Sequence, residues 1–155
     1  MAVKTYNTLE IIERIDEEIG EDIQRVAVAI LSSVVVATPV GNPTLWQNPT
    51  SAPEGYVGGH ARRNWQVSLG ATIQGVRGVE GRGPGKNAAS QESLAAGRAQ
   101  IERVKPSTRR IVIQNNVPYI GLLNDGHSTQ APTSFIETAV MVGRNIARNE
   151  RKDLP

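Results

Sequence analysis

Residues 8–37 read TLEIIERIDEEIGEDIQRVAVAILSSVVVA and decide the main feature of the fold. Apolar residues recur there at spacings of three and four, which places them on one face of a helix. These positions are Ile12, Ile15, Ile19, Ile23, Val26, Ile30 and Val34. Asn7 is suited to cap this helix, with Glu10 completing a capping box. The sequence therefore predicts a helix about 45 Å long, at about 1.5 Å per residue, with a slight break at Gly20.

The two halves of this helix differ in composition. The first half is a charged amphipath that is expected to project, and the second is apolar nearly all round and is expected to be buried. Residues 1–22 carry seven acids and two bases, a net charge of −5, whereas residues 23–155 carry fifteen bases and eight acids, a net charge of +7. This asymmetry suits head-to-tail assembly, in which one subunit's acidic part meets another's basic part. The acids equally suit the positive N-terminal end of the helix.

Two strands are expected beyond the long helix. Residues 38–60 hold four prolines with glycines and asparagines, so they predict an irregular loop. Trp46 and Tyr56 within this loop are expected to pin it to the body. Trp65 then begins an alternation of apolar and polar residues that is typical of a half-buried strand ending at residue 69. Residues 109–114 predict the second strand, with β-branched residues at its centre.

Two further helices are expected around these strands. Residues 70–88 hold six glycines and predict a long mobile loop. Ser90 is suited to cap the helix that follows, which is expected to stop at Pro106. Ser134 and Glu137 form a second capping box, for a last helix that runs to about residue 148.

Length and composition favour a single domain over residues 1–155. We expect an α+β fold in which long N-terminal and C-terminal helices pack on a small, mainly antiparallel sheet, with a flexible loop at about 70–88 and a polar tail over 149–155. The chain has no cysteine, which excludes disulfides and thiolate metal sites. Its longest apolar run, residues 26–40, is too short to span a bilayer. A soluble protein with no membrane partner is therefore expected.

The glycine-rich run at residues 81–87, GRGPGKN, invites comparison with a phosphate-binding loop. That motif needs a glycine where the chain has Glu80 and a Ser or Thr where it has Asn87. The dinucleotide fingerprint fails as well, because Lys86 takes the place of its third glycine. We therefore expect no nucleotide cofactor.

A second cluster joins Asp125, His127 and Ser128. A hydrolytic triad also needs an oxyanion hole, which nothing in the sequence builds. A metal site needs three or four ligands, and His60 is the only other histidine. The residues at 124–126, Asn-Asp-Gly, are typical of a turn. We expect no enzyme, no metal and no cofactor, with a small hydrolase using His127 as an alternative.

Basic residues suggest contact with nucleic acid. Arg77, Arg82 and Lys86 lie in the glycine-rich loop and are candidates to face DNA, with an ordinary solvated loop as the alternative. Four more arginines flank the two predicted strands and suit either phosphate contacts or salt bridges at a subunit interface. They are Arg62, Arg63, Arg109 and Arg110.

Two blocks of sequence stand in a recognisable order. The first is Ala37-Thr38-Pro39-Val40 followed by GGHARRNWQV at residues 58–67. The second is NNVPYIG at 115–121, followed by LNDGHS at 123–128 and QAP at 130–132. In this order they resemble a family of small neck proteins of tailed phages, often labelled tail-completion proteins. The resemblance covers roughly residues 8–147, and a Pro-rich insertion at residues 41–57 departs from it.

The resemblance implies a structural virion protein at the head–tail junction, assembled in the host cytoplasm. It would be one subunit of a homo-oligomeric ring, of six copies, that joins the head connector to the tail and surrounds the DNA passage. Its partners would be the neighbouring connector or adaptor and tail proteins. The alternative is a basic nucleic-acid-binding module, which would bind DNA as a monomer with steep salt dependence. The candidate fold or interface residues are Thr38, Pro39, Arg62, Arg63, Trp65, Asn116, Pro118, Tyr119, Asp125, Gly126, Ser128, Ala131 and Pro132.

Overall fold

The computed structural model describes the backbone of residues 8–152 and the side chains of residues 17–149. The predicted long helix is confirmed as α1 (Thr8–Ala37), and Gly20 does not interrupt it. Asn7 and the side chain of Glu10, the predicted capping box, lie outside the described residues. The remaining elements are η1 (Pro43–Leu45), η2 (Pro49–Ser51), α2 (His60–Arg63), β1 (Trp65–Leu69), α3 (Lys86–Ile101), β2 (Ile111–Asn115), α4 (Ile120–Asn124) and α5 (Phe135–Lys152).

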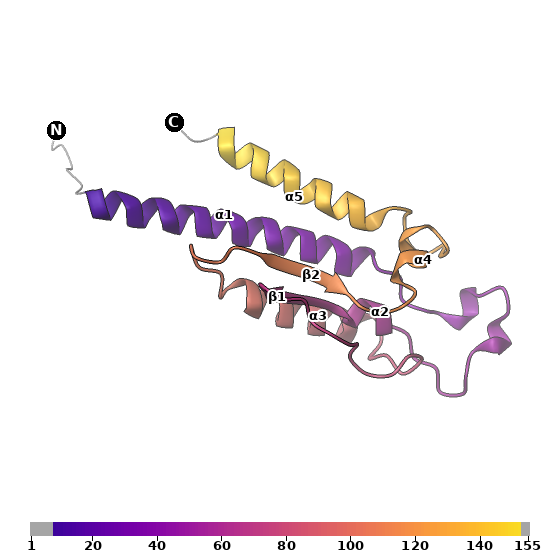
Figure 1. The fold of residues 1–155 in the computed structure, drawn as a ribbon. Helices are drawn as coiled ribbons and strands as arrows, with labels where there is room; N and C mark the ends of the chain where they lie inside the picture. Colours follow the sequence, from indigo (N-terminus) through magenta and orange to yellow (C-terminus); the bar gives the residue numbers. More distant parts are fainter. Residues whose placement is uncertain (1–7, 153–155) are drawn as a thin grey trace.

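Helix α1 is the axis around which the other elements are arranged (Figure 1). Helix α5 runs antiparallel along one side of it, while the sheet and α3 lie on another. Strands β1 and β2 are antiparallel, with Trp65 opposite Asn115 and Leu69 opposite Ile111. The predicted α+β class is confirmed. Within it, α5 packs mainly on α1, and α3 is the helix that packs most closely on β1.

Small residues let the helices approach one another closely. A methyl group at Gly97 of α3 would overlap the side chain of Leu31 on α1, and one at Gly143 of α5 would overlap Ile30. The second half of α1 is buried on one side only, so the predicted burial is confirmed in part: Leu31, Val34 and Val35 are buried, whereas Val36 is 66% exposed. The hydrophobic core combines α1 with both neighbouring layers and contains Ala27, Leu31, Val34, Val35, Trp65, Val67, Ile101, Phe135 and Ala139.

Strand β1 departs from the predicted half-buried pattern, because polar residues at its start are buried too, whereas Ser68 further along is half-buried. Asn64 is 0% exposed and Gln66 is 5% exposed. The chain that follows β1 folds back over this face and supplies their partners. The Asn64 side chain donates to the carbonyl of Arg77 (3.1 Å) and accepts from its N–H (2.6 Å), and Gln66 donates to the carbonyl of Gly75 (3.3 Å). The covering segment is held by polar contacts, which an alternating pattern does not reveal.

The predicted loop over residues 70–88 is therefore more firmly anchored than we expected. From β2, the Gln114 side chain bonds both the N–H (2.9 Å) and the carbonyl (2.7 Å) of Ile73. The last three loop residues belong to α3, which begins at Lys86 directly after Gly85, whose φ is +84°. Ser90 is not the cap but lies inside the helix and donates to the carbonyl of Lys86 (3.1 Å). Mobility of the remaining loop stays a prediction.

Asn124, the last residue of α4, replaces the capping box predicted at Ser134 and Glu137. Its side-chain oxygen accepts from the N–H of Ile136 (2.9 Å), and its amide donates to the Glu137 carboxylate (2.9 Å). Its carbonyl accepts from the N–H of Ser134 (2.7 Å). The hydrogen bond from Asn124 is the main cause that lowers the pKa of Glu137 below its ordinary value. The start of α5 is thus set by a residue eleven positions earlier.

Candidate functional site

Residues of the first sequence block form hydrogen bonds with one another and with the C-terminal end of α1. The Thr38 hydroxyl donates to the carbonyl of Val34 (2.6 Å) and accepts from the indole N–H of Trp65 (2.7 Å). The Arg62 guanidinium donates to the carbonyls of Thr38 (2.9 and 2.6 Å) and Val36 (3.0 Å). Carbonyls in the last turn of a helix have no partner within the helix, and a cation there also complements the helix dipole.

These contacts give the block a role inside the fold. Arg62 is only 7% exposed, so its donors are not available to a phosphate. Burial lowers the pKa of Arg62, although a guanidinium still stays protonated at pH 7. Arg63 pairs with Glu92 of α3 at 2.9 Å, which is an ion pair within one subunit. Trp65 is 4% exposed and belongs to the core.

The second block ties β2 to the rest of the chain. The Asn115 side chain donates to the carbonyl of Ala61 (2.8 Å) and accepts from the N–H of Val117 (3.1 Å). Asn116 donates to the carbonyls of Ile73 (2.8 Å) and Gly75 (2.9 Å). The asparagine pair therefore fastens both α2 and the loop after β1 to the end of β2.

The predicted turn at residues 124–126 is confirmed. Gly126 has φ +89°, and its N–H donates to the carbonyl of Leu123 (3.3 Å). The next N–H, of His127, donates to the carbonyl of Leu122 (3.1 Å), so the pair of bonds closes α4 in a Schellman motif. Asp125 and His127 are exposed and the Ser128 hydroxyl accepts from the N–H of Gln130 (3.2 Å). Within residues 17–149 no hydrogen bond joins Asp125, His127 and Ser128. Beyond the turn, Pro132 is exposed.

The three loop cations predicted to face DNA are anchored at three different places. Arg77 is half-buried, with its backbone held by Asn64. Arg82 is exposed and forms a parallel bridge with Val57. Lys86 is exposed at the start of α3. The backbone therefore does not present them as one continuous element.

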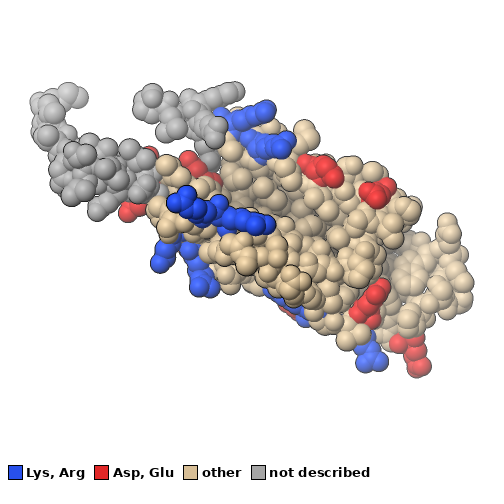
Figure 2. Space-filling view, viewed as in Figure 1, with Lys and Arg blue, Asp and Glu red and all other residues tan. Residues whose placement is uncertain are grey.

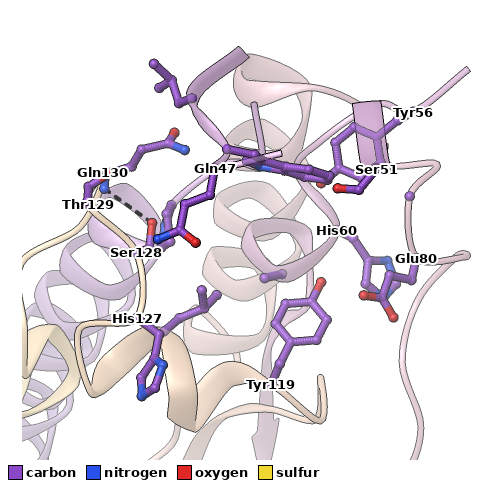
Figure 3. A pocket seen from close by; sticks show the side chains of 18 of the residues that line it. Gln47, Ser51, Tyr56, His60, Glu80, Tyr119, His127, Ser128, Thr129 and Gln130 are labelled. Atoms are coloured by element: carbon purple, nitrogen blue, oxygen red, sulfur yellow. Dashed lines mark hydrogen bonds between the residues drawn. The ribbon is translucent and has the colours of Figure 1, made fainter. Parts of the chain in front are cut away.

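A cavity of about 660 Å³ opens between the Pro-rich segment, α2, the loop at residues 80–81 and the end of α4 (Figure 3). Trp46 and Tyr56 form part of its wall, with ring centroids 5.0 Å apart in an edge-to-face contact. His60, Glu80 and Tyr119 lie on another side. Sequence reasoning missed this cavity because its walls come from segments far apart in the chain. The two aromatic residues in a proline-rich loop were the one local signal.

The cavity offers neutral polar groups and one carboxylate. Burial raises the pKa of Tyr119 to about 12, with further contributions from Glu80 and Tyr56, so its phenol stays protonated at neutral pH. Burial lowers the pKa of His60 below 6.5, and Arg63 adds to this effect while Glu80 opposes it. The Nδ1 atom of His60 is buried without a hydrogen-bond partner in the described structure. Such groups can bind a polar surface, but they do not form a nucleophile–base pair.

A second candidate surface lies at the other end of α1 and carries charges of both signs. The acidic segment, residues 17–25 of α1, has four acids and one base, a net charge of −3. The basic turn, residues 98–110 between α3 and β2, has five bases and one acid, a net charge of +4. Both lie at the left of the view in Figure 1, and Figure 2 shows blue and red side chains together at this end. The five bases are Arg98, Arg103, Lys105, Arg109 and Arg110.

These charges are not neutralised across the surface. Within residues 17–149, the ion pairs of the acidic segment join Glu21 (4.0 Å) and Asp22 (2.9 Å) to Arg25 of the same helix. None of the five bases of the basic turn forms an ion pair with a described residue, and Arg103 donates only to Gln100 (3.5 Å). Two large apolar side chains of the acidic segment are also exposed, Ile19 by 50% and Ile23 by 39%.

No protein-family model, curated protein or solved structure matches the chain. The described helices include none that is both long and apolar enough to cross a membrane. Among the described residues, no group of three or more His, Cys, Asp or Glu side chains could hold a metal ion.

Proposed function

We propose that the chain is a structural virion protein of a tailed phage, one subunit of a neck ring that joins the head connector to the tail around the DNA passage. The observation that carries this proposal is the charged end of the molecule. Exposed apolar residues at Ile19 and Ile23 stand there beside acids and bases that have few partners within the subunit. Surfaces that combine apolar area with charges of both signs suit protein–protein contacts.

The resemblance to neck proteins supports the same function. Its residues make contacts within the subunit: Thr38, Arg62 and Trp65 close the end of α1, and Asn115 and Asn116 fasten β2. A shared set of fold-forming residues is what a common structural framework would require. Catalysis would instead require reactive groups that converge on one point.

The oligomeric state of the purified protein tests this proposal first. Native mass spectrometry and light scattering at rising protein concentration should detect a closed species of about six times the 16.7 kDa chain mass. In a phage that lacks the protein, heads and tails should form separately and remain unjoined. A protein that stays monomeric at every concentration, in a phage whose particles still join without it, would contradict the proposal.

The exposed basic turn also favours a second candidate, a nucleic-acid-binding module. A monomer of this class would bind duplex DNA, and its affinity would fall steeply with salt because each phosphate contact releases counterions. Fluorescence anisotropy with a labelled duplex, measured between low and physiological salt, distinguishes the two. Tight DNA binding by a monomer would favour the module over the ring.

A further inference from the structure

The acidic segment presents three of its four acidic side chains to solvent. Glu18 lies on the side of α1 opposite the core residues Ala27, Leu31 and Val34 at about 3.6 residues per turn. Glu17 lies on the same side as Val35, about five turns earlier, but Glu17 and Glu21 are exposed as well. Glu21 has 73% of its side chain exposed. These acids are therefore available to a second molecule while the helix stays packed in its own subunit.

The basic turn is equally available. Arg98, Arg103, Lys105, Arg109 and Arg110 are all exposed. The backbone beneath them is held in place because Ile101 and Val104 are buried, at 1% and 8% exposure. Its net charge of +4 is close in size and opposite in sign to that of the acidic segment.

The position of the two surfaces is compatible with a ring. Copies in a cyclic ring are related by a rotation, which changes neither the height along the axis nor the distance from it. Two patches that meet between neighbours must therefore lie at the same height along the axis and at the same distance from it. A contact between two different patches gives a ring if the rotation closes and an open filament if it does not. The acidic segment and the basic turn lie at the same end of the molecule (Figure 1), so a ring axis that runs along α1 would place both at the same height.

We infer that neighbouring copies in the ring meet through these surfaces, with the acidic segment of one copy lying on the basic turn of the next. The inference rests on the proposed ring and names the contact that closes it. A second copy fits the basic turn better than DNA does, because a polyanion drawn to the turn would also meet the acids of α1 at the same end. Ile19 and Ile23 supply apolar area that a contact of charges alone would lack.

Two charge-reversed copies test the contact. The acid-reversed copy carries Glu17→Lys, Glu18→Lys and Glu21→Lys, and the base-reversed copy carries Arg103→Glu, Arg109→Glu and Arg110→Glu. Each copy alone would place like charges across every contact. We expect the protein concentration at half-assembly to rise about 10-fold or more for either copy. A 1:1 mixture restores opposite charges at every contact, so rings of alternating copies should return at wild-type concentration.

Controls and readouts separate the inference from the proposed function. Circular dichroism melting confirms that each copy folds, and the reversals Glu54→Lys and Arg82→Glu, outside both surfaces, should leave assembly unchanged. If the wild-type protein forms rings and each reversed copy alone assembles at the same concentration, the proposed contact is wrong but the proposed ring is not. If the mixture forms only dimers, the two copies pair through the same surfaces in both directions, and the head-to-tail contact is wrong. A base-reversed copy that assembles normally but loses binding to duplex DNA would assign the turn to DNA. Wild-type protein that never assembles would overturn both proposals.

Discussion

The two ends of α1 treat charge in opposite ways. At the C-terminal end, the Arg62 cation is buried and donates to two main-chain carbonyls and to the Ser90 hydroxyl. At the N-terminal end, the bases of the basic turn are exposed and form no ion pair with a described residue. A buried charge must be satisfied inside the subunit, because leaving it unpaired costs several kcal/mol, roughly 3–5. An exposed charge carries no such penalty and remains available to a partner.

This contrast separates arginines that the sequence alone presents as equals. Arg62 and Arg109 both flank a strand, yet one completes a helix terminus and the other faces solvent. The difference predicts that substitutions near the C-terminal end of α1 affect stability, whereas substitutions at its charged end affect assembly. Five substitutions or titrations test this division.

The largest effect is expected for Trp65→Ala. The indole is 4% exposed, packs in the core and donates to Thr38. Removal of the indole should lower the free energy of unfolding by about 3–5 kcal/mol. The lost burial and the empty space that it leaves in the core both contribute to this cost, because the surrounding residues relax only in part. Urea unfolding followed by circular dichroism measures the loss. Trp46→Ala, in the Pro-rich segment, is the matched control and should cost less. An unchanged midpoint for Trp65→Ala would place the ring outside the core.

Arg62→Met should come next. It keeps the aliphatic stem and removes the donors to the carbonyls of Val36 and Thr38. Loss of hydrogen bonds from a charged group should cost about 1.5–3 kcal/mol of unfolding free energy. The same substitution at Arg109, which is exposed, provides the control in the same urea titration. Equal stability of the two variants would break the contrast between the ends of α1.

Asn124→Ala should have a smaller effect. It removes the acceptor for the N–H of Ile136 at the start of α5, and loss of such a cap costs about 1 kcal/mol. The Glu137 carboxyl should also lose its lowered pKa, which carbon-detected NMR titration can follow. Asn145→Ala, at an exposed position within α5, is the control. If the pKa of Glu137 is the same in Asn124→Ala as in the wild type, the assigned contact is contradicted.

The titration of His60 predicts a pH dependence of stability. Its folded-state pKa lies below 6.5, so the unfolded chain binds the proton more readily. The stability it contributes is complete above pH 6.5 and is lost as the pH falls through the folded-state pKa. The midpoint of unfolding should therefore fall as the pH is lowered from 7.5 to 5. The fall should be smaller in His60→Gln. His127→Gln, at an exposed histidine, should retain it.

The smallest effect on stability is expected at the charged end. Glu17→Gln and Arg109→Gln remove exposed charges, and surface changes of this kind shift the unfolding free energy by about 0.5 kcal/mol or less. Both proteins should therefore melt like wild type in a thermal scan at a concentration where all are monomeric. A loss of stability as large as that of Arg62→Met would mean that these charges form stabilising contacts within the subunit.

Local patterns in the sequence were enough to predict the elements whose causes are local. The apolar spacing in residues 8–37 predicted α1 to the residue, and the alternation after Asn64 predicted β1. The Asn-Asp-Gly run predicted the turn at Gly126, since the positive φ required there is a property of the backbone itself. The second strand was placed about two residues early at its start, which is a boundary error and not an error of type.

The remaining features depend on contacts between distant segments. Asn64 and Gln66 are buried because residues 75–77 return over them, and Asn124 begins α5 because α4 ends beside it. The cavity exists because four separate segments meet around it. Sequence alone thus determined the helix, the strands and the surplus of opposite charges in two parts of the chain. Only the tertiary structure decided that Arg62 is satisfied inside while both charge surpluses share one end, because burial and partners are set by packing and not by neighbours in sequence.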